Sequence, residues 1–417
     1  MNVPPAGLHK GGIPRGLAIE GPALLSYGFR PFFLGAGLFA VAAMLLWIGA
    51  LTQGWEIGGS RYGALNWHAH EMLFGYVAAA LAGFMLTAIP NWTGRLPVSG
   101  RPLLLLVLLW LAGRAVMVAP EQFGIYPAAV VEAAFLPVLA GIAGREIITG
   151  RNWKNLKILV ALGVLSGVNI AFHVMVLAGA NPMVLMRAGV AVFVALIAVV
   201  GGRIVPSFTR NWLSRAGAVR LPHPYDQFDT VAIVGLIAAL VSWTVIPLSA
   251  VTAALALAAS ALQLWRLIRW RGIDAAREPL LAMLHIAYLF VPVGLAAIAL
   301  SAMGWLEAPS TLHLLSVGAI GCMTLGVMTR ATLGHTGRTL SASAWTVVSY
   351  LSLLTAAIIR PLAELFPGFY YEMLAVAGTA WIAAFAVFSV EYGRYLILPR
   401  AVAASVPIAR SPPTAAR

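Results

Sequence analysis

Two histidines and a glutamate stand close together in the segment Trp67-His68-Ala69-His70-Glu71-Met72, at the start of an apolar stretch that continues to Pro90. Ionisable side chains in a membrane-type segment are costly and are usually functional. Neutral imidazole is also the commonest metal ligand in proteins. The segment is therefore the first candidate for a metal or cofactor site.

The spacing within this segment predicts two different roles for its histidines. His68 and His70 are two residues apart, a rotation of about 200° on a helix, so their rings should point to opposite sides. One helix could then serve two centres, or one histidine could ligate while the other forms a hydrogen bond. Glu71 shares the face of His68 and could accept the second N–H of a ligating histidine, or carry protons.

The composition is that of a membrane protein. Of the 417 residues, 61% are hydrophobic and 10% are charged, against about 25% charged residues in soluble domains. The mean hydropathy is +0.89. The first apolar stretch is longer than that of a signal peptide, so no cleavable signal is expected. The single cysteine, Cys322, excludes an intrachain disulfide and a cysteine-based zinc or iron–sulfur cage.

Windows of about 20 apolar residues predict an all-α integral membrane protein with about twelve transmembrane helices. Residues 31–398 then form a single polytopic membrane domain between cytoplasmic tails at 1–30 and 399–417. The predicted spans are 31–53, 67–90, 102–119, 124–147, 155–178, 182–205, 228–247, 249–270, 279–303, 309–333, 343–366 and 370–398.

The distribution of basic residues supports this number of spans. With twelve spans, 23 of the 27 basic residues fall on one side of the membrane. This predicts that both termini are cytoplasmic, and that the net charge of +13 sets orientation and does not serve nucleic-acid binding. The exceptions are Arg61, Arg114, Arg187 and Arg360.

Spans two, six and ten share a weak pattern. Each ends in a polar, basic turn, and a polar residue (His70, Arg187 or His313) stands roughly 20 residues before that turn. A four-helix unit repeated three times would produce this pattern. Chance similarity among apolar sequences is the alternative.

The predicted topology also assigns depths to the ionisable residues. Several of them fall within about 6 Å of one depth in the outer half, at a rise of 1.5 Å per residue. A single membrane histidine is better explained as a hydrogen-bonding helix contact, but a cluster at one depth favours a metal or haem site. The outer group is His68, His70, Glu71, His173, Arg187 and His313, and a sparser cytoplasmic group is Arg203, His285, Arg330 and His335.

Several motifs resemble those of the NnrS proteins of bacteria. The resemblance implies about twelve spans, a location in the bacterial inner membrane, haem b and copper as cofactors, and a role in nitric oxide metabolism and resistance to nitrosative stress. The matching segments are Gly28-Phe29-Arg30-Pro31-Phe32-Phe33, the segment 67–72, Gly83-Phe84-Met85-Leu86-Thr87, Pro90-Asn91-Trp92-Thr93-Gly94, His313 with Gly318-Ala319-Ile320-Gly321, Met328-Thr329-Arg330 and Gly334-His335-Thr336-Gly337-Arg338.

This resemblance suggests how the histidines are used. His70 and His313 are expected to hold a haem, and His68 and His173 are candidates for a second centre nearby. The two cytoplasmic-side histidines form another site or have structural roles. A weaker similarity to haem–copper oxidases and nitric oxide reductases is offset by the lack of an adjacent histidine pair. The full set of candidate metal ligands is His68, His70, His173, His285, His313 and His335.

The leading hypothesis is a protein that reduces or scavenges nitric oxide taken up from the membrane, in the manner of a nitric oxide reductase, with an unknown electron donor. Glu71 and Glu132 are then candidate catalytic residues on a proton path. Arg187 and Arg330 are candidate cofactor-binding residues, and Arg187 could neutralise a haem propionate. Lipid is the other expected partner. The alternatives are a small-solute transporter, because helix-breaking prolines lie within several spans, and a metal or nitric oxide sensor without turnover.

Overall fold

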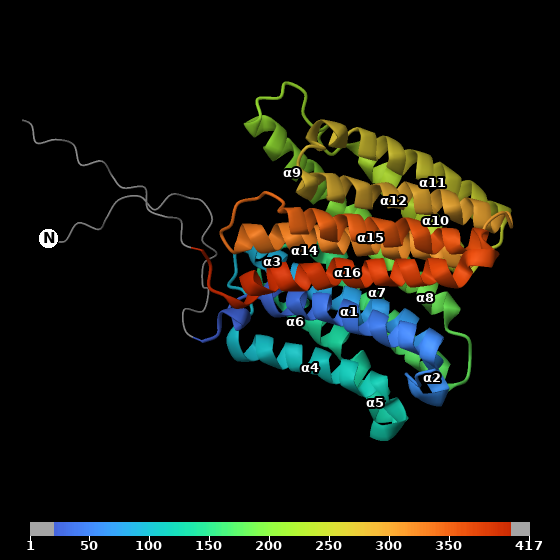
Figure 1. The fold of residues 1–417 in the computed structure, drawn as a ribbon. Helices are drawn as coiled ribbons and strands as arrows, with labels where there is room; N and C mark the ends of the chain where they lie inside the picture. The colour runs from blue at the N-terminus through green and yellow to red at the C-terminus, as the bar shows by residue number, and fades with distance from the viewer. Residues whose placement is uncertain (1–20, 402–417) are drawn as a thin grey trace, which may run out of the picture.

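The computed structural model of the chain describes residues 21–401, and all regular structure within this range is helical. Twelve helical segments are long and apolar enough to cross a membrane. They lie side by side along one direction, and the two ends of the described chain lie at the same end of the bundle (Figure 1). The prediction of an all-α membrane protein with twelve spans is confirmed. The predicted tails lie mostly outside the described residues.

The helices are as follows, in chain order. The spans are α1 (Phe29–Gln53); α2 (Gly59–His70) with η2 (Glu71–Val77) and α3 (Ala78–Thr93); α4 (Gly100–Val118); α5 (Ile125–Ala133) with α6 (Phe135–Thr149); α7 (Leu156–Leu177); α8 (Met183–Leu196) with η5 (Ile197–Gly201) and α9 (Gly202–Arg215); α10 (Gln227–Val245); α11 (Ala250–Ile268); α12 (Pro279–Ala302); α13 (Ala308–His313) with η7 (Leu314–Gly321) and α14 (Cys322–His335); α15 (Ala344–Leu362); and α16 (Tyr370–Ile397). Short 3₁₀ turns are η1 (Ala23–Leu25), η3 (Pro120–Phe123), η4 (Trp153–Asn155), η6 (Gly272–Ala275), η8 (Ala363–Leu365) and η9 (Pro367–Phe369).

Span two begins at Gly59, so the boundary predicted at residue 67 is wrong. Gly58 and Gly59 have φ angles of 74° and 61°, which glycine adopts without strain, and they make the turn into the helix. The first helical residues, 60–66, are too polar for a hydropathy window to detect. The histidine-containing segment therefore lies inside a long helix and not at its mouth.

Span two is also the most interior helix of the bundle. In its most apolar stretch 78% of residues are buried, followed by 67% in span nine and 61% in span ten, whereas the other spans have 28–44%. Polar side chains on span two therefore face other helices and not lipid. They need partners inside the protein, because an unpaired polar group in an apolar environment is costly.

Spans two, six and ten each contain a π-helical segment: η2, η5 and η7. π-helical segments are rare in proteins, and many of those that do occur lie at functional sites. In spans two and ten the π segment begins directly after a histidine, His70 and His313 respectively. These are the same three spans in which the sequence pattern of a polar residue and a basic turn recurs.

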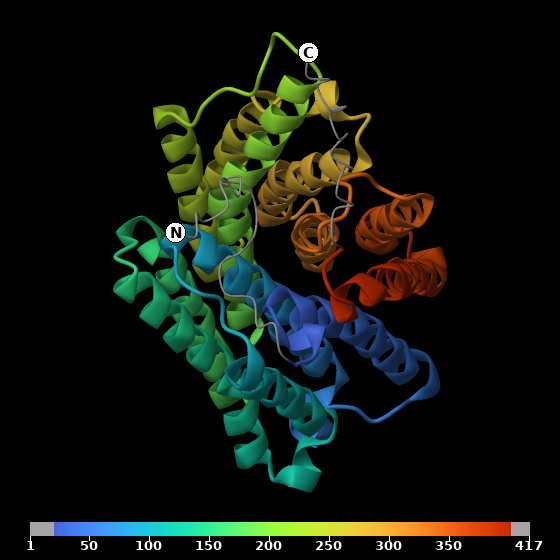
Figure 2. The same cartoon turned by 90° about the vertical axis from the view of Figure 1, so that its left-hand side faces the viewer.

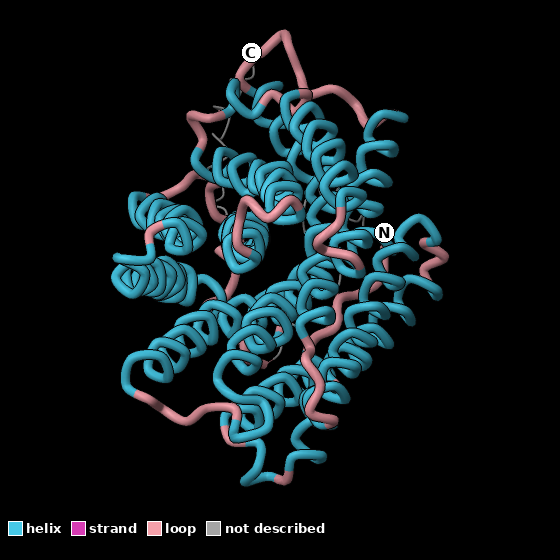
Figure 3. The backbone as a smooth tube through the Cα atoms, turned by 90° about the vertical axis from the view of Figure 1, so that its right-hand side faces the viewer, coloured by secondary structure: helices cyan, strands magenta, loops and turns pink. Residues whose placement is uncertain are grey.

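The first and last spans pack against each other and close the bundle (Figure 2). Figure 3 views the helices from the opposite end. Arg30, near the start of α1, donates from Nη1 to the carbonyl oxygens of Leu396 and Leu398 at 2.8 and 2.7 Å. The last carbonyls of a helix lack partners within it, so Arg30 caps α16. The early motif at 28–33 therefore joins the start of α1 to the end of α16.

Candidate metal centre

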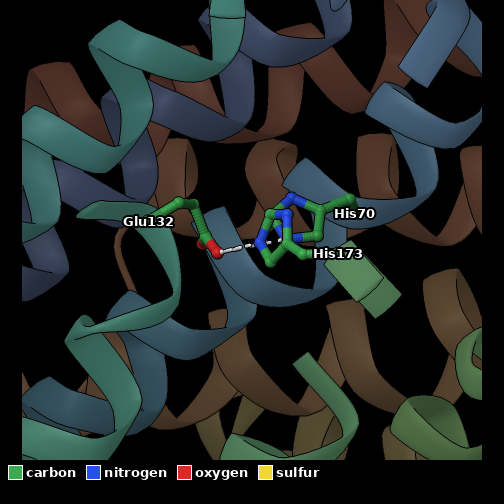
Figure 4. A group of neighbouring side chains, drawn as sticks. All are labelled: His70, Glu132 and His173. Carbon is green, nitrogen blue, oxygen red and sulfur yellow. Dashed lines mark hydrogen bonds and ion pairs between the residues drawn. The ribbon is translucent and has the colours of Figure 1, made fainter. Parts of the chain in front are cut away.

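His70, Glu132 and His173 come together from three spans. Each offers one ligand atom, and these atoms all lie within 4.8 Å of one another. The three residues are 0%, 1% and 3% exposed, and their side chains converge in Figure 4. Among the described residues this is the one group of three or more possible ligands close enough to hold a metal ion.

Each ligand stands at a defined place on its helix. His70 is the last residue of α2, directly before η2, while Glu132 lies on α5 and His173 on α7. The ring of Phe172 stacks on that of His70 with 4.8 Å between centroids. The chain thus provides an apolar wall beside the imidazole, which limits access of water to the centre.

The Nε2 atoms of both histidines face Glu132. His173 Nε2 lies 2.7 Å and His70 Nε2 3.3 Å from Glu132 Oε2. The Nδ1 atoms form hydrogen bonds on the side of each ring away from Glu132. His70 Nδ1 lies 2.9 Å from Glu71 Oε1, and His173 Nδ1 lies 2.7 Å from the Tyr62 hydroxyl. Metal-ligating histidines usually have such a partner on the second nitrogen, because it fixes the orientation of the ring.

Both ring nitrogens of His70 face oxygen acceptors. Besides Glu71 and Glu132, the amide oxygen of Asn169 lies 2.9 Å from His70 Nε2, while the Asn169 amide nitrogen donates to Glu132 Oε2 at 2.8 Å. A neutral imidazole has one N–H. A doubly protonated ring, or a cation bound at Nε2, satisfies these acceptors.

Arg114 of α4 links the two carboxylates of the centre. Its Nη1 donates to Glu71 Oε2 at 2.6 Å, and its Nη2 donates to Glu132 Oε1 at 2.5 Å. A Cβ atom on Gly75 would lie 2.6 Å from Arg114 Nη1, so the glycine in η2 makes room for the guanidinium.

One guanidinium between two buried carboxylates leaves a net negative charge when both histidines are neutral. An unbalanced buried charge is expensive. A metal cation would balance it, as would protonation of one imidazole. Two imidazoles and one carboxylate form a donor set that copper accepts, and non-haem iron(II) accepts it too. The residues therefore fit a redox-active metal ion.

A second histidine pair lies on the other side of span two. His68 stacks on Trp47 of α1 with 4.3 Å between ring centroids, and it lies within electrostatic range of His313 and Arg360. His68 Nδ1 is buried and has no hydrogen-bond partner. His313 Nδ1 donates to the carbonyl of Pro309 at 2.7 Å, which leaves its Nε2 free for a ligand. An orphaned ring nitrogen and a second imidazole are donors that a haem iron accepts. Arg360 beside them is paired with Glu364 at 3.1 Å.

The comparison with known families bears on this arrangement. A family model described as NnrS protein matches residues 23–400. The chain belongs to the NnrS family. None of the curated proteins compared with this chain matches it. The match covers all twelve spans, so both histidine clusters lie within the family's extent.

In this NnrS family member the histidines are grouped differently from the expected pairs. The sequence analysis paired His70 with His313 and His68 with His173. The structure brings His70 to His173 and His68 towards His313. Similar depth did not determine these pairs, because the rotation of span two turns His68 towards α1 and His70 towards α7.

The two predicted cofactor-binding arginines have other neighbours. Arg187 Nη2 lies 3.5 Å from the carbonyl oxygen of Thr244 on α10, and Arg187 Nε is buried without a partner. Arg330 stacks over the ring of Phe208 at 4.2 Å. Arg360, which was not selected from the sequence, is the arginine beside the His68–His313 pair.

The two histidines predicted to lie on the cytoplasmic side, His285 and His335, also have separate surroundings. His285 Nε2 lies 2.8 Å from the Thr209 hydroxyl. The His335 ring packs against Tyr27 and Phe29, with centroids 5.9 and 5.5 Å away. His285 Nδ1 is buried and, within the described residues, has no hydrogen-bond partner. Neither histidine lies in a group of three possible metal ligands among the described residues.

Sequence reasoning missed Tyr62, Arg114 and Asn169 as members of the buried network. The sequence did set Arg114 apart, because it is one of the four basic residues that do not fall on the same side of the membrane as the other 23. Asn169 precedes His173 by four residues and so shares its helix face. Tyr62 lay outside the predicted span, which hid it.

Proposed function

We propose that this chain is a haem- and copper-binding protein of the bacterial inner membrane that handles nitric oxide by reducing or scavenging it. The proposal assigns copper to His70, Glu132 and His173, and haem to His68 and His313 with Arg360 beside a propionate. Membership of the NnrS family supports both cofactors. An electron donor is required and is a partner of the chain.

One observation carries the copper assignment. The three ligand atoms of the His70–Glu132–His173 group lie within 4.8 Å of one another. His70 Nδ1 is hydrogen-bonded to Glu71, and His173 Nδ1 is hydrogen-bonded to Tyr62. Both imidazole rings therefore direct Nε2 towards Glu132. A protein that only packed these helices would have no need of two imidazoles orientated towards one carboxylate.

The haem and copper, when bound, would supply electrons and a binding place for nitric oxide. The chain's own residues would supply protons, because reduction of nitric oxide to nitrous oxide and water consumes protons together with electrons. Glu71 is linked to the metal ligand Glu132 through Arg114 at hydrogen-bond distances, and it would hold a proton close to the metal. Phe172 and Phe74 flank the His70 ring and would keep bulk water away.

The deciding experiment is an absorption spectrum of the purified full chain in detergent, reduced with and without nitric oxide, with copper and iron analysis of the same sample. We expect a Soret band, copper in the preparation, and a spectral shift on addition of nitric oxide. Protein without a Soret band and without copper would contradict the proposal.

Turnover separates the enzyme from a sensor. Consumption of nitric oxide with an artificial electron donor, followed with an electrode, is expected for the enzyme. Cofactor binding without consumption would favour a sensor. Flux of a solute into vesicles that contain metal-free protein would favour a transporter.

A further inference from the structure

A polar pocket opens at the basic end of the bundle, far along the helices from the histidine clusters. Its cavity volume is about 400 Å³, and it lies between the start of α7, the π-to-α junction of span six and the loop at 216–226. Figure 2 faces this end of the molecule. Three cationic side chains line it: Lys157, Arg203 and Arg210.

The cations of this pocket lack acidic partners among the described residues. Lys157 and Arg203 lie within electrostatic range of each other. Arg203 donates to the amide oxygen of Asn155 at 3.3 Å, and Arg210 donates to the carbonyl of Pro222 at 2.5 Å. Neither acceptor carries charge. Like charges held together without a counter-ion repel one another.

Among the described residues that line the pocket, the one carboxylate, Asp229, is already neutralised. Asp229 Oδ1 accepts from Arg266 Nε at 2.7 Å, and Asp229 Oδ2 lies 3.7 Å from Arg269 Nη1. Asp229 is therefore unable to serve as counter-ion for Lys157 and Arg203, and the pocket keeps an excess of positive charge.

The wall of the pocket also holds an unsatisfied donor. Arg266 is fully buried, and its Nη2 has no hydrogen-bond partner. A Cβ atom on Gly202, which lines the pocket, would lie 2.3 Å from Arg266 Nη2. The absence of a side chain at residue 202 therefore leaves the guanidinium directly behind the pocket wall. The charge of Arg266 is paired with Asp229, but its unsatisfied Nη2 leaves a hydrogen-bond donor behind the part of the wall that Gly202 forms.

We propose that this pocket binds a phosphate-class anion through Lys157, Arg203 and Arg210. Phosphate oxygens accept charge-assisted hydrogen bonds from guanidinium and ammonium groups. The anion is either the headgroup of an anionic lipid or a soluble phosphate. Basic pockets between membrane helices on the cytoplasmic side are typical binding places for anionic headgroups. This inference is independent of the proposed function, because no member of either histidine cluster lines the pocket.

The test uses the purified full chain in detergent. Its melting temperature is measured during titration with inorganic phosphate, against chloride at equal ionic strength, and in mixed micelles of phosphatidylglycerol, against phosphatidylcholine. The pocket variant is Lys157→Gln/Arg203→Gln. The matched control is Lys154→Gln/Arg101→Gln, which removes two cations from the same end of the molecule outside the pocket. A conservative variant, Lys157→Arg/Arg203→Lys, keeps the charge if the pocket variant is poorly folded.

We expect a saturable rise in melting temperature for the wild-type chain, the control and the conservative variant. The apparent affinity should be at least about tenfold weaker in the pocket variant, because two charge-assisted contacts are lost. A response to free phosphate identifies a soluble anion, and a response to phosphatidylglycerol alone identifies a lipid headgroup. Equal responses of the pocket variant and the control would overturn the proposal. So would the lack of any response beyond those to chloride and phosphatidylcholine.

Discussion

His68 and His70 stand two residues apart on one helix and contact different walls of the bundle. His68 stacks on Trp47 of α1, with 4.3 Å between ring centroids, and His70 stacks on Phe172 of α7 at 4.8 Å. One span therefore contributes to two clusters. Because the clusters use different partners, their cofactors should be separable by mutation.

The first prediction concerns this separation. His173→Ala removes a ligand from the proposed copper centre only, so it should deplete copper and leave the Soret band of the proposed haem. His313→Ala should have the opposite effect. Metal analysis and absorption spectra of the two purified variants provide the measurement. His9→Ala, in the N-terminal segment, is the control and should lose neither cofactor. Loss of both cofactors in each variant, with the fold intact, would mean that the two clusters form a single site.

The sequence was sufficient to predict the twelve spans, because apolar length and the placement of basic residues are local properties of the chain. The opposite orientation of His68 and His70 was also predictable, since it follows from the helical rotation per residue. Their partners were not, because these depend on which helices are neighbours and how span two is rotated. Depth alone grouped Arg187 with the histidines, whereas in the structure Arg187 lies against α10.

The partners of Glu132 were likewise not predictable from the sequence. Glu132 was selected as a proton carrier, and the structure adds that it lies between Arg114 and two imidazoles. Spans two, three, four and five must all be in place before these groups meet. The threefold repeat stays a prediction, supported by the π segments in spans two, six and ten.

The second prediction concerns Tyr62, whose hydroxyl forms a hydrogen bond with His173 Nδ1. Tyr62→Phe removes the hydroxyl that lies 2.7 Å from His173 Nδ1 and keeps the ring that packs in the core. Loss of such a supporting contact weakens metal affinity by about 10–100-fold. Copper retention is measured against a graded series of chelators. Tyr126→Phe, on an exposed tyrosine at the same end of the bundle, should retain copper as the wild-type chain does. Unchanged retention in Tyr62→Phe would remove this residue from the site.

The third prediction concerns the buried charges. Arg114→Met leaves the carboxylates of Glu71 and Glu132 without their shared cation, and breaking a buried ion pair in this way costs about 3–5 kcal/mol. Thermal unfolding in detergent should show a clear decrease in melting temperature. Adding Glu132→Gln to Arg114→Met should restore part of the loss, because one uncompensated charge is removed. Arg61→Met, at an exposed arginine, is the control. Equal stability of Arg114→Met and the control would contradict this account of the network.

The fourth prediction concerns the closure of the bundle. Arg30→Ala removes the hydrogen bonds to the carbonyls of Leu396 and Leu398, and hydrogen bonds from a charged group contribute about 1.5–3 kcal/mol. The end of α16 should then become more sensitive to limited proteolysis, with cleavage mapped by mass spectrometry. Arg394→Ala, on an exposed arginine that donates to the Tyr395 hydroxyl, is the control. Identical cleavage in the two variants would show that Arg30 does not hold the end of α16.

The last prediction concerns pH and the loop before α10. Asp226 stands outside the spans, and its hydrogen-bonded partner Arg269 lowers the pKa of the Asp226 carboxyl from 3.8 to about 2. A lowered pKa means that the ion pair stabilises the folded chain above pH 4 or so, and that this contribution disappears as the pH falls towards 2. The difference in melting temperature between the wild-type chain and Asp226→Asn should therefore be constant from pH 5 to pH 8 and shrink below pH 4. High salt should reduce it while Asp226 is ionised, because the Asp226 side chain is partly open to solvent and the pair is therefore screened. A difference that grows on acidification would show that Asp226 is stabilised in its protonated form and that Arg269 is not its effective partner.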